Sequence, residues 1–104
     1  MLPGLLGCSA VFLGAFGAHA LKGIEPALLA TWSTASQYHL IHSVALLYSS
    51  TRSPLATRLL TAGIFIFSGS LYLLVLTRAK FLGALTPVGG LLLAAGWAAL
   101  AVDK

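Results

Sequence analysis

The stretch TRLLTAGIFIFSGSLYLLVLT, residues 57–77, decides the fold class of this chain. Its one charged residue, Arg58, lies next to its amino-terminal end. About 20 residues of this kind form a helix that crosses ~30 Å of hydrocarbon, at a rise of 1.5 Å per residue. Alternation with a period of two is absent, so the stretch does not suit a strand of a membrane barrel. It predicts a transmembrane helix.

Three further apolar runs accompany this stretch, at residues 2–21, 34–51 and 82–102. Short polar segments separate the four runs, and the whole chain is 59% hydrophobic and 8% charged, with a mean hydropathy of +0.98. A soluble domain carries about 25% charged residues, so these values exclude a water-soluble monomer. The sequence predicts a single domain, residues 1–104. We expect an all-α integral membrane four-helix bundle with short connections and both termini on the same side.

The longest connection follows the first run, and its residues 26–33 have two interpretations. Pro26 before Ala-Leu-Leu-Ala is typical of a helix that begins at proline. Trp32 is of a residue type that favours the membrane interface. We therefore expect either a short helix lying in the interface or an ordinary linker.

Charged residues are few and scattered. The net charge of +4 arises from six basic and two acidic residues, which lie singly or in pairs near the ends of the apolar runs. This placement is typical of side chains that reach lipid headgroups, so we expect membrane lipids as partners and no nucleic acid. Because the basic residues are divided equally between the two sides, they do not predict the orientation.

Small residues predict how the helices pack, because close approach of backbones stabilises helix pairs in lipid. In the first run, a stripe with spacings of three and four consists of Gly4, Gly7, Ala10, Gly14 and Gly17. We expect this stripe to pack within the chain. In the last run Gly89 and Gly96 recur at seven, and Pro87 is expected in the first turn of its helix. Remaining glycine faces leave surface for a homo-oligomer or a larger membrane complex.

The second run carries polar side chains that are costly to place among lipid tails, and ionisable residues there are functional hypotheses. Counting from the same membrane boundary at 1.5 Å per residue places His39 ~8 Å deep, His42 ~12 Å, Tyr72 ~8 Å and Ser70 ~11 Å. Polar groups from all four runs thus gather in one half of the membrane. Tyr38 and His42, four residues apart on one face, are expected at the centre of a polar pocket. The candidate ligand-binding residues are His19, Tyr38, His42, Ser70, Tyr72 and Thr86.

Three functions are compatible with this polar cluster. It is a structural network in a small structural or accessory protein, or a pocket that binds a lipid, a quinone, haem or a metal. The third is an oligomeric transporter of small solutes or protons, against which both carboxylates, Glu25 and Asp103, lie at the ends of runs. The three histidines match no strong metal motif, so we predict no metal and no cofactor. No acid could orient a histidine beside a nucleophile, so we predict no catalytic residue and no enzyme.

Four motifs in order resemble a known family. They are GAFGAHAL at 14–21; Trp32, Thr34, Ala35, Tyr38 and His42 at their spacing; FSGSLYLL at 67–74; and TPVGG at 86–90 with Gly96 and Trp97. Together they closely resemble the domain of unknown function 423 family, which includes transmembrane protein 256. The resemblance covers nearly the whole chain.

The resemblance implies a small multi-span protein of bacterial inner membranes, with eukaryotic relatives associated with mitochondria and no agreed activity. The family motifs include the six candidate residues and Pro87. His39 departs from the pattern, in which glutamine or another polar residue is expected after the tyrosine. A site that uses His39 together with a second histidine is therefore not implied.

Overall fold

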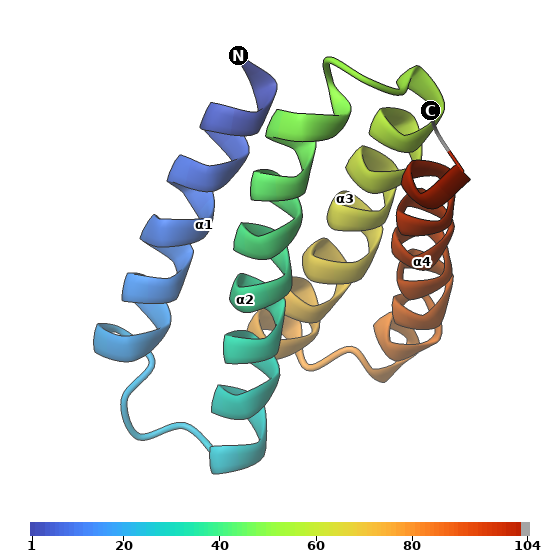
Figure 1. The fold of residues 1–104 in the computed structure, drawn as a ribbon. Helices are drawn as coiled ribbons and strands as arrows, with labels where there is room; N and C mark the ends of the chain where they lie inside the picture. Colours follow the sequence, from blue (N-terminus) through green and yellow to red (C-terminus); the bar gives the residue numbers. More distant parts are fainter. Residues whose placement is uncertain (103–104) are drawn as a thin grey trace.

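Proline stands in the first turn of every long helix. The computed structural model describes residues 1–102 and contains α1 (Leu2–His19), α2 (Pro26–Ser49), α3 (Pro54–Thr77), the short 3-10 helix η1 (Lys80–Ala84) and α4 (Thr86–Val102) (Figure 1). Proline lacks the N–H that would be unpaired in a first turn, so it starts a helix at little cost. Pro87 is the second residue of α4, which confirms its predicted position.

The helices follow one another across a curved layer in the order of the chain (Figure 1). Among the described residues, the extensive interfaces join α1 to α2, α2 to α3, and α3 to α4. The layer measures 47 × 26 × 16 Å. As a result α1 and α4 form opposite edges, and the amino terminus lies at the same end as the end of α4 (Figure 1).

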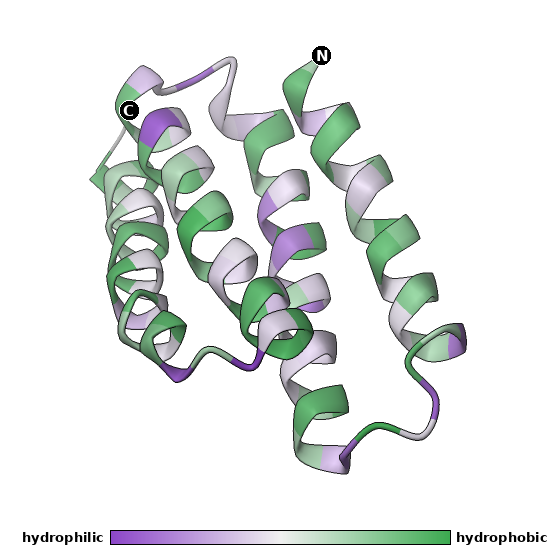
Figure 2. Ribbon diagram, turned by 180° about the vertical axis from the view of Figure 1, so that it is seen from behind, coloured by the Kyte–Doolittle hydropathy of each residue, from purple (hydrophilic) through white to green (hydrophobic). Residues whose placement is uncertain are grey.

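Three segments within residues 1–102 are long and apolar enough to cross a membrane: α1, α3 and residues 80–102. Helix α2 is as long as α3 but less hydrophobic, and Figure 2 shows hydrophilic positions along its middle. Helix α2 packs between α1 and α3 and runs alongside them within the layer of helices. Its polar side chains at His39, His42, Ser43 and Ser49 are buried rather than exposed to lipid. The predicted all-α membrane bundle is confirmed.

Glycines of α3 and α4 allow these two helices to approach closely. A Cβ at Gly89 would overlap the backbone of Phe67, and one at Gly96 would overlap the side chain of Leu60. Leu93 packs in the same way over Gly63. The spacing of seven between Gly89 and Gly96 therefore marks the contact face with α3, as small residues do in membrane helix pairs.

The glycine stripe of α1 faces α2 over most of its length. Cβ positions at Gly7 and Gly14 lie within van der Waals distance of Ser43 and Ser36, and one at Gly17 would overlap the indole of Trp32. Gly4 has no neighbour within 4 Å of such a Cβ. The predicted packing within the chain therefore holds from Gly7 onward.

The boundaries differ from the sequence prediction at five places, two of which are small: α2 ends at Ser49 rather than at residue 51, and α3 begins at Pro54 rather than at residue 57. Residues 26–33 are neither a separate interfacial helix nor a linker, because they form the first two turns of α2. The first helix ends at His19 rather than at residue 21, and α4 begins at Thr86 after η1 instead of at residue 82. Trp32 explains why α2 begins as early as Pro26, since its side chain is buried against α1 and this packing stabilises the first turns of the helix.

Candidate functional site

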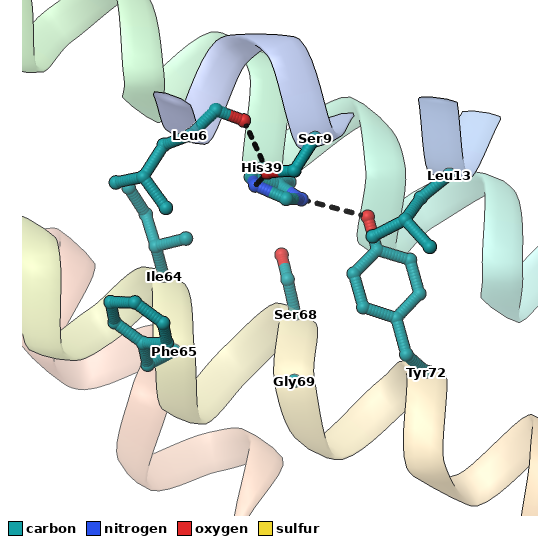
Figure 3. A pocket seen from close by; sticks show the side chains of 9 residues that line it. All are labelled: Leu6, Ser9, Leu13, His39, Ile64, Phe65, Ser68, Gly69 and Tyr72. Atoms are coloured by element: carbon teal, nitrogen blue, oxygen red, sulfur yellow. Dashed lines mark hydrogen bonds between the residues drawn. The ribbon is translucent and has the colours of Figure 1, made fainter. Parts of the chain in front are cut away.

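His39 lies at the meeting point of three helices. Its Nδ1 is 3.0 Å from the hydroxyl oxygen of Tyr72 on α3, and its Nε2 is 3.2 Å from Oγ of Ser9 on α1 (Figure 3). The His39 side chain is buried. One imidazole thus links α1 and α3 through α2, although α1 and α3 share no extensive interface.

The direction of these hydrogen bonds follows from the partner of Ser9. The Ser9 hydroxyl donates to the carbonyl oxygen of Leu6 at 2.9 Å, so its oxygen accepts the proton of His39 Nε2–H. In that tautomer Nδ1 carries no proton and accepts from the Tyr72 hydroxyl. As long as Ser9 donates to Leu6, the hydrogen bonds run in one direction, from Tyr72 through a neutral His39 and Ser9 to Leu6.

A groove opens beside this chain of hydrogen bonds, between α1 and α3 (Figure 3). Its volume is about 200 Å³. Most of its walls are apolar, with His39 contributed by α2. The lining residues are Leu6, Ser9 and Leu13 of α1, His39, and Ile64, Phe65, Ser68, Gly69 and Tyr72 of α3. The Ser68 hydroxyl already donates to the carbonyl oxygen of Ala35 at 2.8 Å, so its oxygen can only accept a hydrogen bond from a ligand.

His42 forms a second polar cluster, on the α4 side of α2. The indole N–H of Trp97 donates to His42 Nε2 at 3.0 Å, and His42 Nδ1 lies 2.7 Å from the backbone oxygen of Tyr38. Because an indole only donates, Nε2 must be the unprotonated nitrogen, and Nδ1–H then donates to the Tyr38 oxygen. Both ring nitrogens are satisfied, so neither is free to bind a metal in this arrangement.

The side chain of Tyr38 stacks on His42, with ring centroids 5.7 Å apart and an interplanar angle of 20°. It also packs on Phe67 of α3, at a centroid distance of 4.7 Å. The predicted shared face of Tyr38 and His42 is confirmed. Tyr38 is 42% exposed, so it lies at the surface of the bundle rather than at the centre of a pocket.

The six predicted site residues fall into separate places. Tyr38 and His42 are together, and Ser70 pairs with Thr86 at 2.7 Å between α3 and α4. Tyr72 pairs instead with His39, a residue outside the predicted set. His19 is exposed as the last residue of α1. Five of the six residues therefore lie in three separate polar clusters, in place of the single pocket predicted around Tyr38 and His42.

Trp32 supports the His39 cluster from the side. Its indole N–H donates to the carbonyl oxygen of Leu13 at 2.7 Å, and its ring packs on Tyr72 at a centroid distance of 4.7 Å. The ring also covers Gly17, where any side chain would collide with it. Sequence reasoning placed Trp32 at the membrane interface and missed this role. The glycine at 17 was the available signal of a large side chain seated against α1.

Within residues 1–102, no group of three or more His, Cys, Asp or Glu side chains is placed to hold a metal ion. The site therefore consists of aromatic, hydroxyl and imidazole groups. Such groups donate and accept hydrogen bonds, and they suit the recognition of an uncharged polar group in a membrane.

A family model described as protein of unknown function (DUF423) matches residues 13–90. The chain belongs to the DUF423 family. The match includes His39, His42 and Tyr72 but not Ser9 or Trp97. The resemblance seen in the sequence motifs is confirmed, and the family description assigns no activity.

Relatives of this DUF423 protein occur in bacteria and in yeast. UPF0382 membrane protein SAB0533 of Staphylococcus aureus is 44% identical over 110 residues, covering 98% of this chain and 90% of the relative. UPF0382 membrane protein YwdK of Bacillus subtilis is 41% identical, covering 89% and 84%. UPF0382 membrane protein C1782.12c of Schizosaccharomyces pombe is 39% identical, covering 94% and 93%. No solved structure matches the chain.

Proposed function

We propose that this DUF423 protein is a non-catalytic accessory protein of the membrane, in which buried polar side chains fix the packing of the helices. The observation that carries the proposal is the pairing of all four ring nitrogens of His39 and His42 within the chain. Hydrogen bonds between membrane helices contribute about 0.6–2 kcal/mol each. Imidazoles whose ring nitrogens are all hydrogen-bonded within the chain stabilise helix packing and have no free nitrogen for acid–base chemistry.

The charge distribution also supports a non-catalytic role. Catalytic histidines are commonly oriented by a carboxylate, and none of the helices within residues 1–102 contains an acidic residue. The same absence of acidic side chains from the spans gives no support to proton transport. No observation favours a transporter over an accessory protein.

The edges of the helical layer are the proposed contact surfaces. Large apolar side chains are exposed on α1 and α4, among them Val11, Phe12, Phe16 and Leu91. Membrane lipids, a second copy or another membrane protein would cover them. Helical rather than barrel spans, with relatives in bacteria and yeast, support a bacterial inner membrane or, in a eukaryote, a mitochondrial membrane.

Native mass spectrometry after cross-linking in intact membranes tests the accessory role. We expect the protein in a complex of defined stoichiometry, either with itself or with another membrane polypeptide. A bare monomer, obtained under conditions that preserve a known membrane complex in the same sample, would contradict the proposal. A retained small molecule of defined mass would instead favour a binding function.

A second candidate function, the binding of a small membrane-soluble ligand, is favoured by one observation. A groove of about 200 Å³ opens between α1 and α3 beside the His39–Tyr72 hydrogen bond. A purely structural network needs no hollow next to it, since packed interfaces exclude space of this size. The accessory role and this binding role are compatible in one protein.

A further inference from the structure

We propose that the groove between α1 and α3 binds a compound of the quinone class: a flat six-membered ring that bears a carbonyl or hydroxyl group. The inference rests on the second candidate function, because it names the ligand of the same groove. It is carried by the size of the groove, by the free space over Gly69, and by the hydrogen-bond chain from Tyr72 to Ser9.

The groove has room for one such ring. Its volume is about 200 Å³, whereas a dry cavity of about 150 Å³ in another protein binds benzene. A Cβ at Gly69 would meet no atom within 4 Å, so the α3 wall leaves the groove open at this point. Because the groove lies between two helices that share no extensive interface, a hydrocarbon substituent of the ring can extend into the lipid.

The Tyr72 hydroxyl can recognise a carbonyl or a hydroxyl, depending on the tautomer of His39. When His39 carries its proton on Nε2, Tyr72 donates to Nδ1 and its oxygen accepts a hydrogen bond from a ligand hydroxyl. When the proton is on Nδ1, His39 donates to the Tyr72 oxygen, and the Tyr72 proton is free for a ligand carbonyl. Ser9 then donates to Nε2 instead of to Leu6, at the same 3.2 Å distance.

The two tautomers require no movement of heavy atoms, which is why this arrangement suits the quinone class. A ring carbonyl and the ring hydroxyl formed on its reduction have the same shape but opposite hydrogen-bonding character. An acyl chain would use neither state of Tyr72. The Trp32 ring, 4.7 Å from that of Tyr72, keeps the tyrosine in place for either ligand.

The fluorescence of Trp32 can report ligand binding in the groove. The chain has two tryptophans, so Trp97→Phe leaves Trp32 as the sole indole, next to Tyr72. We would titrate this variant, in nanodiscs of phosphatidylethanolamine and phosphatidylglycerol, with decylubiquinone and follow quenching of fluorescence. Saturable quenching is expected. If Trp97→Phe fails to fold, calorimetric titration of the unmodified chain replaces the fluorescence measurement.

Variants of the groove separate its shape from its polarity. Gly69→Leu should abolish saturable binding without unfolding the protein, because its side chain enters open space. Tyr72→Phe should weaken binding roughly tenfold, equivalent to the loss of one hydrogen bond of about 1.4 kcal/mol. Tyr38→Phe is the matched control and should leave binding unchanged, since Tyr38 does not line the groove.

Decylbenzene, which lacks oxygen, serves as the competitor. If it displaces the quinone at equal concentration, or if Tyr72→Phe binds as well as the unmodified chain, the groove accepts hydrocarbon only and the quinone class is wrong. If Gly69→Leu is quenched like the parent, the groove is not a binding site and the second candidate function itself is wrong. The two failures are therefore distinguishable.

Discussion

The indole N–H of Trp97 donates a hydrogen bond to Nε2 of His42 across 3.0 Å, and this bond joins two helices that share no extensive packing interface. Trp97 is on α4 and His42 is on α2, with α3 packed against both. The rings meet edge to face at 5.8 Å. This polar contact thus connects α4, at the edge of the layer, to α2 on the far side of α3.

Replacing Trp97 with Phe should destabilise the bundle by about 1 kcal/mol. The change keeps an aromatic ring but removes the N–H, which leaves the buried Nε2 of His42 without a donor. The measurement is the midpoint of unfolding in mixed detergent micelles, followed by circular dichroism. In a His42→Ala background the same substitution should cost much less, and equal losses in both backgrounds would show that the bond contributes nothing.

Gly17→Ala should destabilise the contact between α1 and α2 by about 1–3 kcal/mol, because the added methyl group collides with the buried Trp32 ring. Gly4→Ala on the same helix is the matched control. It meets nothing within 4 Å and should be neutral, or slightly stabilising through helix propensity. The measurement compares the unfolding midpoints of the two variants, and similar midpoints would contradict the packing of the Trp32 ring against Gly17.

Two adjacent glycines on α4 allow a sharper test of its packing on α3. A Cβ at Gly89 would overlap the backbone of Phe67, which cannot turn aside, whereas one at Gly90 would make ordinary contact with the Phe67 ring. Gly89→Ala should therefore lower stability by about 2 kcal/mol or more, and Gly90→Ala should leave it within about 0.5 kcal/mol. A larger effect at Gly90 than at Gly89 would mean that α4 presents another face to α3.

The fold class followed from the sequence because it depends on length and apolarity, which a chain displays directly. The site did not, because counting residues gives depth in the membrane but not direction around a helix. Ser70 and Tyr72 have similar depths, yet residues two apart on a helix do not share a face. Ser70 accordingly pairs with Thr86 of α4, and Tyr72 pairs with His39 of α2.

His39 departs from the family pattern and is not among the predicted site residues, although its depth, equal to that of Tyr72, indicates that the two side chains can meet. The position of Trp32 is likewise predicted only from its preference for membrane interfaces, which does not reveal its contact with α1. The glycine stripe of α1 indicated a close partner, but it did not say which residue would fill the space at Gly17. Pairing across helices therefore required the three-dimensional arrangement.

His39 stands at a position where the family pattern has glutamine or another polar residue. His39→Gln should be tolerated within about 0.5 kcal/mol, because a glutamine amide carries both a donor for Ser9 and an acceptor for Tyr72. His39→Leu fills a similar space but leaves the hydroxyls of Ser9 and Tyr72 without their partner, and it should cost about 1–3 kcal/mol. The difference in unfolding midpoint between these variants measures the polar link across α1, α2 and α3. Equal stability of His39→Leu and the unmodified chain would show that packing alone holds these helices together.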